Sequence, residues 1–310
     1  MIEVKNLKKK FGKTIAIDDV SFEIHKGETL GLVGESGCGK STLGRTLLGL
    51  EKQNSGDVFF EKKELSTFSS KELKLLRKEM QIIFQDPYAS LNPRMTASDI
   101  IAEPLDIHRL TPAKHQREEK ILELLSLVGL PSYMRSRFPH EFSGGQRQRI
   151  GIARALASSP KFIVCDEPIS ALDVSVQAQI INLLKKLQME MGLTYLFIAH
   201  DLAMVKYLST RVAVMYLGHI VELGFADDLY NHPKHPYTEA LLSAIPIPDP
   251  LLERARHRII LKGELPSSSD SPKGCVFASR CPHATDHCRA VRPEWKEVAP
   301  NHFTACHLIK

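Results

Sequence analysis

The sequence predicts an α/β fold in which helices cover a parallel β-sheet. Over the first 225 residues, short apolar runs alternate with helical patterns. One apolar run leads straight into a glycine-rich turn, and two others enclose a long amphipathic helix. Strand, helix and strand in this order require crossover connections, which place helices on the faces of a parallel sheet. Hydrophobic residues make up 43% of the 310 residues and charged residues 25%, which excludes a disordered chain.

The elements of this fold are predicted in chain order. Runs of strand length, the first of them alternating and the rest apolar, predict five strands: residues 20–24, 30–33, 82–84, 162–165 and 195–199. A helix is expected over 42–50, and another over 176–191 ends at Gly192. Residues 212–223, with Gly218 in the middle, predict a terminal hairpin.

Two segments depart from this alternation. From about 96 to 142 no run of strand length occurs, while Ile121, Leu124, Leu125 and Val128 form one helical face. This pattern predicts a helical insertion that extends to about residue 150.

The second departure is the tail. The stretches 245–250 and 265–272 are rich in proline and serine and are typical of linkers, and cysteine and histidine are concentrated beyond residue 231. We therefore expect a main domain at 1–245 and a small Cys-rich C-terminal extension at 246–310.

Composition also limits the compartment and the partners. No run approaches the roughly 18 apolar residues of a membrane-spanning helix, and the first ten residues lack the apolar centre of a secretory signal. We expect a cytoplasmic protein whose six cysteines stay reduced. A net charge of +5 is too small to indicate nucleic-acid binding.

The glycine-rich turn after residues 30–33 carries the clearest functional motif. It fits the pattern G-x-x-x-x-G-K-[ST] and lies between a strand and a helix, as a phosphate-binding loop requires. Its backbone N–H groups would wrap the phosphates, Lys40 would reach the β- and γ-phosphates, and Ser41 would bind Mg²⁺. The sequence thus predicts a nucleoside triphosphate site formed by Gly34, Glu35, Ser36, Gly37, Cys38, Gly39, Lys40, Ser41 and Thr42.

Three further segments indicate the class of nucleotidase. Ser143-Gly144-Gly145-Gln146 opens a helix and offers a second anion site, although a capped helix start explains it equally well. Asp166 and Glu167 end an apolar strand, where Asp166 would bind Mg²⁺ and Glu167 would activate the attacking water. His200 follows another strand, where its imidazole could touch the γ-phosphate.

Together these segments resemble the nucleotide-binding subunits of ABC transporters over residues 1–245. The resemblance implies a P-loop, RecA-like core with an N-terminal antiparallel β subdomain, an ATP and Mg²⁺ requirement, and catalytic roles for Lys40, Glu167 and His200. It further implies that Phe11 stacks on adenine, that Gln85 senses Mg²⁺ and couples to membrane subunits, and that Asp173 communicates between two nucleotide sites.

The same resemblance implies a dimer of ATPase subunits, either a homodimer or a heterodimer. In the family two subunits bind head to tail, and Ser143-Gly144-Gly145-Gln146 of one caps the ATP held by Lys40 of the other. A guanine-reading Asn-Lys-x-Asp motif, which a small GTPase would need, does not occur in the sequence.

Three longer segments resemble the oligopeptide and dipeptide branch of importers: 84–94, 235–242 and 274–282. The resemblance implies ATP-driven peptide uptake by a peripheral subunit on the cytoplasmic face of the inner membrane. Its partners would be two membrane permeases, a sister ATP-binding subunit and an external solute-binding protein.

Two alternative functions stay open. One is the same role for nickel, glutathione or another small solute, since importers of these belong to the same branch. The other is a soluble ABC-type ATPase that acts on DNA or the ribosome. The short interval from Gln85 to Ser143 and the single phosphate loop argue against this second alternative.

The four tail cysteines are spaced irregularly at Cys275, Cys281, Cys288 and Cys306. In a reducing compartment, metal ligands are favoured over disulfides. The sequence lacks the paired C-x2–4-C knuckles of structural zinc sites, so the spacing favours a 4Fe–4S cluster, and the family resemblance points the same way. The alternatives are zinc, with His283, His287, His302 or His307 in place of a thiolate, and a reduced tail without metal.

Overall fold

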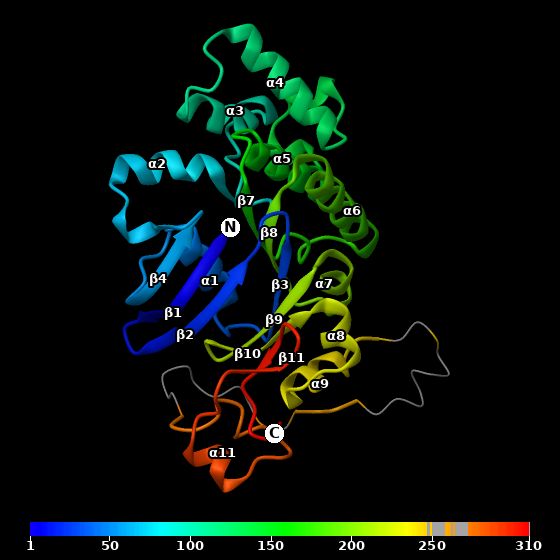
Figure 1. Ribbon diagram of the computed structural model, residues 1–310. Helices are drawn as coiled ribbons and strands as arrows, with labels where there is room; N and C mark the ends of the chain where they lie inside the picture. Colours follow the sequence, from blue (N-terminus) through cyan, green and yellow to red (C-terminus); the bar gives the residue numbers. More distant parts are fainter. Residues whose placement is uncertain (247–248, 250–257, 262, 264–271, 310) are drawn as a thin grey trace. The chain divides into compact units, whose positions relative to one another are not determined.

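The computed structural model describes residues 1–246, 249, 258–261, 263 and 272–309 (Figure 1). The chain divides into two compact units. The first unit contains Met1, Ile24–Glu28 and Lys63–Ala199, and the second contains Ile2–Glu23, Thr29–Lys62 and His200–Lys310. Within the described part of the chain, none of the helices combines the length and the apolar character needed to cross a bilayer.

Three parallel strands form the centre of the first unit: β6 (Met80–Ile83), β7 (Phe162–Asp166) and β8 (Thr194–Ile198). Met80 pairs with Phe162, and Phe162 pairs in turn with Thr194. Every residue of β7 and β8 is buried, as is usual for parallel strands with covered faces. The predicted strands at 162–165 and 195–199 are confirmed. The strand predicted at 82–84 ends at Ile83, and Phe84 beyond it is exposed.

The remaining elements of the first unit are mostly helical. They are β5 (Lys63–Glu64), a 3-10 turn (Leu65–Thr67), α2 (Ser70–Glu79), α3 (Ala97–Ile107), α4 (Lys114–Leu127), two 3-10 turns (Ser132–Ser136 and Pro139–Glu141), α5 (Gly144–Leu156) and α6 (Val174–Met191). The predicted helical insertion is confirmed by α3 and α4. The apolar face of α4 is buried as expected.

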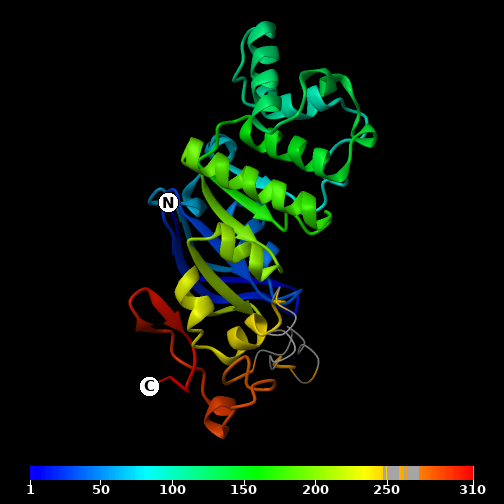
Figure 2. The same ribbon diagram turned by 90° about the vertical axis from the view of Figure 1, so that its right-hand side faces the viewer.

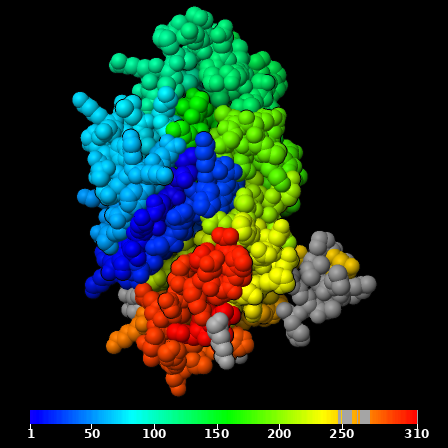
Figure 3. Space-filling view, in the orientation of Figure 1, coloured from blue at the N-terminus to red at the C-terminus, as the bar shows by residue number. Residues whose placement is uncertain are grey.

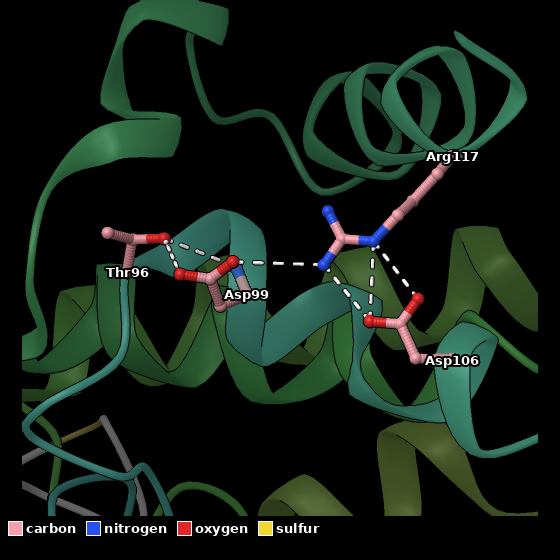
Figure 4. Close-up of polar contacts among 4 residues, drawn as sticks. All are labelled: Thr96, Asp99, Asp106 and Arg117. Atoms are coloured by element: carbon pink, nitrogen blue, oxygen red, sulfur yellow. Dashed lines mark hydrogen bonds and ion pairs between the residues drawn. The ribbon is translucent and has the colours of Figure 1, made fainter. Parts of the chain in front are cut away.

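Polar contacts join the two helices of the insertion (Figure 4). Arg117 of α4 places Nε and Nη2 each 3.0 Å from the Asp106 carboxylate at the end of α3, and Nη2 lies 3.7 Å from Asp99. Thr96 caps α3 by accepting the Asp99 backbone N–H at 3.2 Å. These groups are partly exposed, so they orient the helices more than they stabilise them.

Helix α6 has the predicted C-terminal end and most of the predicted buried face, but it differs from the prediction at one residue. The helix ends at Gly192, whose φ of 63° is the left-handed conformation that glycine adopts without strain. Ile180, Leu183, Leu184 and Leu187 are buried as predicted. Met191, predicted for the same face, is instead 39% exposed.

An antiparallel sheet begins the second unit. Its strands β1 (Ile2–Phe11), β2 (Thr14–Ile24) and β4 (Ser55–Phe60) lie in the order β2-β1-β4. Val20, Phe22 and Ile24 alternate with exposed neighbours and are buried, which confirms the predicted alternating strand. The antiparallel β subdomain implied by the resemblance is therefore present.

A second group of strands in this unit extends into the tail. Strand β3 (Thr29–Val33) is parallel to β9 (Arg211–Tyr216), and β9 forms a hairpin with β10 (His219–Phe225). The hairpin is confirmed, but it is not terminal. Strand β12 (His302–Thr304) pairs with β10, and β11 (Lys296–Ala299) pairs with β12.

Helices α1 (Lys40–Leu47), α7 (Leu202–Leu208), α8 (Ala226–Asn231), α9 (Pro236–Leu242) and α11 (Asp286–Ala290) complete the second unit (Figure 2). Helix α1 starts two residues before the predicted helix and ends at Leu47 rather than Leu50. The glycine-rich loop passes directly into its first turn, so Lys40 and Ser41 are helical.

A buried ion pair attaches β12 to β10. The carboxylate of Glu222 is fully buried and lies 2.7 Å from His302 Nε2. It also accepts the backbone N–H groups of Lys234 and His235 at 2.7 and 3.0 Å. These partners satisfy the charge that burial would otherwise penalise. Because His302 lies 80 positions from Glu222 in the sequence, no local pattern predicts this anchor.

The tail also lies beside β2 in the second unit (Figure 3). Trp295 and Ala305 of the tail line one cavity of about 450 Å³ with Val20 and Ser21 of β2. The predicted boundary at 245/246 borders residues outside the described part of the chain, and so do most residues of the two predicted linkers. The boundary therefore stays a prediction.

Candidate nucleotide site

The phosphate loop connects β3 to α1 in the second unit, and steric contacts fix two of its glycines. Gly34 and Gly39 have φ values of 152° and 108°. A Cβ at Gly34 would lie 2.1 Å from the Met215 carbonyl oxygen, and one at Gly39 would lie 2.1 Å from that of Ala16. Backbone atoms cannot move aside cheaply, so both positions need glycine.

The side chain of Lys40 is buried and turned back into this loop. Its Nζ donates to the carbonyl oxygens of Gly34 at 2.8 Å and Glu35 at 3.0 Å, and lies 3.8 Å from Cys38 Sγ. Burial raises the pKa of the Cys38 thiol, which keeps that neighbour neutral. An ammonium group at the start of α1 adds its charge to the helix N-terminus, and this combination favours phosphate.

Phe11 and His200 also belong to the second unit. Phe11 ends β1, and its ring is 46% exposed, with Lys9 Nζ 4.4 Å from the ring centroid. His200 is exposed and immediately precedes Asp201, which caps α7 by accepting the N–H groups of Ala203 and Met204 at 2.9 and 3.1 Å. The sequence analysis missed this cap, although an aspartate before an apolar helix is its usual signal.

The end of β7 in the first unit carries the two predicted carboxylates. Asp166 is the last residue of the strand and is 2% exposed. Glu167 follows with φ 46°, a left-handed backbone conformation that costs a non-glycine residue about 1–3 kcal/mol. Its N–H donates to Ile198 O at 3.0 Å, and its C=O accepts the Ser170 hydroxyl at 3.1 Å. These bonds hold the backbone in the strained conformation.

Gln85, which the sequence connected to this site only by family resemblance, contacts Glu167 directly. Gln85 Nε2 donates to Glu167 Oε2 at 2.8 Å. Gln85 follows β6, which pairs with β7, so the two side chains leave the carboxyl ends of neighbouring parallel strands. The amide of Gln85 therefore orients one carboxylate oxygen of Glu167.

The Ser143 motif also lies in the first unit and opens α5 as predicted. Gln146 N–H donates to Ser143 Oγ at 3.3 Å, while Ser143 N–H donates to Gln146 Oε1 at 3.0 Å, which is a capping box. A Cβ at Gly145 would lie 2.4 Å from Val176 Cγ1. The helix start therefore packs against the start of α6, where Asp173 is exposed and makes no side-chain cap.

The four tail cysteines gather around one cavity of about 10 Å³. Burial raises the pKa of Cys275 to about 11 and also raises those of Cys281 and Cys306, whereas a hydrogen bond from Thr285 lowers that of Cys288. Across the described ranges, no three His, Cys, Asp or Glu side chains are arranged to hold a metal ion. The thiols are thus close together, but they are not a preformed metal site.

Two residues that touch the phosphate loop were missed as site residues. The N–H of Glu35 donates to Tyr237 Oη at 2.9 Å, and the Glu35 carboxylate pairs with Arg280 at 2.6 and 3.1 Å. Both partners lie in segments that carry the resemblance to the peptide branch. The sequence contains Tyr237 and Arg280 within those long segments, but no sequence pattern indicates that both contact Glu35.

The structure thus divides the predicted site residues between the two units. The second unit contains the phosphate loop, Phe11 and His200, and the first contains Gln85, Asp166, Glu167, Asp173 and the Ser143 motif.

Two family models match the chain. The ABC transporter model matches residues 17–170, and the model for the C-terminal region of oligopeptide/dipeptide transporters matches residues 221–288. Among solved structures, the ADP- and phosphate-bound dimer of the ATP-binding cassette MJ0796 is 31% identical with a TM-score of 0.67. The match covers 73% of this chain and 99% of the cassette.

Curated relatives are similar over nearly their whole length. The putative oligopeptide transport ATP-binding protein YkfD of Bacillus subtilis is 58% identical, with 100% of this chain and 96% of the relative covered. The oligopeptide transport ATP-binding protein OppF of Escherichia coli is 54% identical, with 94% and 88% covered. The chain therefore belongs to the ATP-binding subunits of ABC transporters, in the branch that carries the oligopeptide/dipeptide transporter C-terminal region.

Proposed function

We propose that the chain hydrolyses ATP to drive the uptake of oligopeptides or dipeptides across the cytoplasmic membrane. The observation that carries the enzymatic part is the Glu167 carboxylate, which Gln85 holds at 2.8 Å directly after the buried Asp166. On the same chain, a glycine loop that tolerates no side chain at two positions holds the Lys40 ammonium. The peptide cargo is supported by the relatives, which are named oligopeptide transport proteins.

The chemistry assigned to these residues is phosphoryl transfer to water. Lys40 offsets the negative charge on the γ-phosphoryl group, and Mg²⁺ held by Ser41, Gln85 and Asp166 would neutralise further charge. Glu167 accepts a hydrogen bond from the attacking water, whose oxygen bonds to the γ-phosphorus as the bond to the ADP oxygen breaks. The proton leaves through the carboxylate.

Two exposed side chains of the second unit, Phe11 and His200, would contact the nucleotide. Phe11 stacks on adenine with its exposed ring face, and His200 contacts the γ-phosphate. Their exposure in the second unit supports both roles, because each presents a side chain that a ligand can reach. Substitution of Lys40 by alanine tests the phosphate site: ATP binding by the full chain should weaken at least about tenfold, as expected for the loss of a charge-assisted contact. Unchanged ATP binding by this variant would contradict the assignment.

The partners in this proposal are a sister ATP-binding subunit, two membrane permeases and an external solute-binding protein. The two ATP-binding subunits pair head to tail, so that the Ser143 motif of one subunit caps the nucleotide held by Lys40 of the other. Asp173 lies at the interface between them. A heterodimer is proposed over a homodimer. Exposure of Ser143 and Asp173 supports this placement.

Residues 89–98, just beyond Gln85, would contact a coupling helix of a permease on the cytoplasmic face of the membrane. Tyr88 beside this segment is 60% exposed, and Arg147 lies 4.9 Å over its ring, so an aromatic surface is available there. Site-directed crosslinking from Ser90 in the assembled transporter should capture a permease. Crosslinking from Lys186 on the exposed side of α6 serves as the control. A survey of 89–98 without any permease adduct would contradict this placement.

Uptake by cells that lack this chain tests the cargo. Labelled dipeptides and oligopeptides should no longer accumulate, and a plasmid copy carrying Glu167→Gln should not restore uptake. Normal peptide uptake together with lost nickel or glutathione uptake would instead assign one of the alternative solutes.

For the tail we propose a 4Fe–4S cluster on Cys275, Cys281, Cys288 and Cys306. The support is their gathering around one cavity and the need of such clusters for four thiolates. No catalytic step depends on electrons, so the cluster has a structural or sensing role. Protein purified anaerobically should be brown, and Cys281→Ser should remove the colour. A colourless preparation with stoichiometric zinc, or with no metal, would establish one of the two alternatives.

A further inference from the structure

Glu35, the second residue of the phosphate loop, is held from two directions by the C-terminal part of the chain. Its backbone N–H donates to Tyr237 Oη at 2.9 Å, and its carboxylate accepts two hydrogen bonds from Arg280 at 2.6 and 3.1 Å. Its carbonyl oxygen accepts Lys40 Nζ at 3.0 Å. A single residue therefore connects the C-terminal region to the ammonium group that meets the phosphates.

The contact from Arg280 has the geometry of a strong ion pair. Two guanidinium nitrogens face two carboxylate oxygens, and the Arg280 side chain is only 8% exposed. A bidentate pair fixes orientation as well as distance, and partial burial protects it from screening by salt. Arg280 lies 245 positions from Glu35 in the sequence, so the pair forms only when the tail is folded against the loop.

Tyr237 is fixed equally firmly by its own surroundings. Its ring is fully buried and packs on Tyr216 and Phe277, with centroids 4.7 and 5.4 Å away. The backbone N–H of Tyr237 donates to Nδ1 of His235. The backbone N–H of His235 in turn donates to the buried Glu222 carboxylate. The hydroxyl is thus presented to Glu35 from a rigid cluster, because few of its neighbours can rearrange.

A glycine-rich loop lacks side chains that would hold it in one conformation. Ordering it on nucleotide binding costs conformational entropy, and external contacts that fix the loop beforehand reduce this cost. We propose that Arg280 and Tyr237 are positioning residues that hold the phosphate loop, and with it Lys40, in the conformation that binds ATP. This inference rests on the proposed ATP site and deepens it: the C-terminal region completes the nucleotide site rather than only extending the chain.

The experiment measures ATP affinity of the full chain together with kcat and KM for ATP in the assembled transporter. Arg280→Ala should raise the dissociation constant and the KM about tenfold, and Tyr237→Phe should raise them about fivefold, as expected for a charge-assisted and a neutral hydrogen bond. The kcat should change less than about twofold, because neither residue touches the reacting atoms. Arg280→Lys should fall between wild type and alanine, because lysine cannot form the bidentate pair.

Two further variants separate positioning from general stability. Arg289→Ala removes an exposed tail arginine paired with Asp286, and its KM should equal that of wild type. The double variant Glu35→Ala with Arg280→Ala should bind ATP no more weakly than Glu35→Ala alone, since both changes remove one interaction. Tyr237→Phe retains the packed ring, so it remains informative if Arg280→Ala fails to fold.

The inference is wrong if Arg280→Lys and Tyr237→Phe bind ATP as wild type does, if kcat falls at unchanged KM, or if the double variant is additive. If Lys40→Ala weakened ATP binding while Arg280→Lys and Tyr237→Phe bound ATP as wild type does, the inference would be overturned and the proposed ATP site would stand. If Lys40→Ala bound ATP normally, the ATP site itself would be misassigned.

Discussion

The phosphate loop and the turn at Glu167 are stabilised by different parts of the chain. The Glu167 turn depends on its own unit, through Gln85, Ser170 and Ile198. The phosphate loop depends on residues more than 200 positions away, Tyr237 and Arg280. The carboxylate geometry is thus built into the strand order, whereas the loop geometry requires a folded C-terminal region.

This difference predicts different consequences for substitutions. Changes at the Glu167 turn should affect the chemical step, because the surrounding strands still fold and nucleotide still binds. Changes around the phosphate loop should affect affinity, because they alter the conformation that receives the phosphates.

The largest effect is expected for Glu167→Gln. The amide can still accept the Gln85 hydrogen bond but can no longer take a proton, so kcat should fall about a thousandfold while ATP binding is retained. Mixed with its sister subunit and ATP, the purified variant should accumulate as a closed dimer, detectable by size. Glu190→Gln on the exposed side of α6 is the control. Hydrolysis at the normal rate would show that Glu167 is not the base.

A smaller effect is expected for Gly39→Ala, which acts on the loop. Its Cβ would meet the Ala16 carbonyl oxygen at 2.1 Å and its φ is 108°, so ATP affinity should fall about a hundredfold. Gly37→Ala is the matched comparison, since its φ is 79° but no atom lies within 4 Å of the added carbon. Titration with a fluorescent ATP analogue should rank Gly37→Ala between wild type and Gly39→Ala. The reverse order would mean that steric contact does not shape the loop.

Phe11→Ala should lower ATP affinity about tenfold, because stacking on a base is worth about 1–3 kcal/mol. Phe11→Tyr should retain affinity, since the ring face is unchanged. Phe59→Ala removes an aromatic ring from β4 that similarly faces a lysine, Lys5 at 5.0 Å, and should leave affinity unchanged. Equal loss from Phe11→Ala and Phe59→Ala would argue against a specific adenine contact.

The smallest effect concerns pH and the attachment of the tail to β2. Burial, reinforced by Arg292 of the tail, lowers the pKa of His219 to about 4 despite Asp18 at 3.5 Å. Between pH 6.5 and 4 the unfolded chain binds a proton that the folded chain rejects. The free energy of unfolding should therefore fall by about 1.4 kcal/mol per pH unit from this group as the pH decreases.

Burial also lowers the pKa of His235 to about 4, which adds a second, equal contribution over the same range. Urea unfolding at pH 7.5 and 5 should show a strong pH dependence, and His219→Gln should remove about half of the contribution of these two groups. Identical pH dependence in the variant and wild type would show that His219 is not buried in its neutral form.

Several elements could be predicted from sequence because their determinants are local. The phosphate loop is defined by glycines and a lysine within eight residues, and the buried strands β7 and β8 are continuous apolar runs. Helix α6 carries its own periodicity and its own stop at Gly192. Family resemblance supplied Gln85, and only the structure shows its contact with Glu167.

Strand β12 and the Glu222–His302 pair could not be predicted from sequence, because the residues that stabilise them lie far away along the chain. Strand β12 has three residues, too few for a pattern, and it forms because β10 offers an unpaired edge. The Glu222–His302 pair joins positions 80 apart, and burial makes it necessary.

The sequence by itself determined the nucleotide chemistry, because the required residues are consecutive and their backbone conformation follows from glycine. Only the tertiary structure decided what holds that chemistry in place. A glutamate at position 35 is compatible with many surroundings, and the chain must fold before Tyr237 and Arg280 reach it. Long-range hydrogen bonds depend on where the backbone returns, and that is set by packing of the whole unit rather than by any local run of residues.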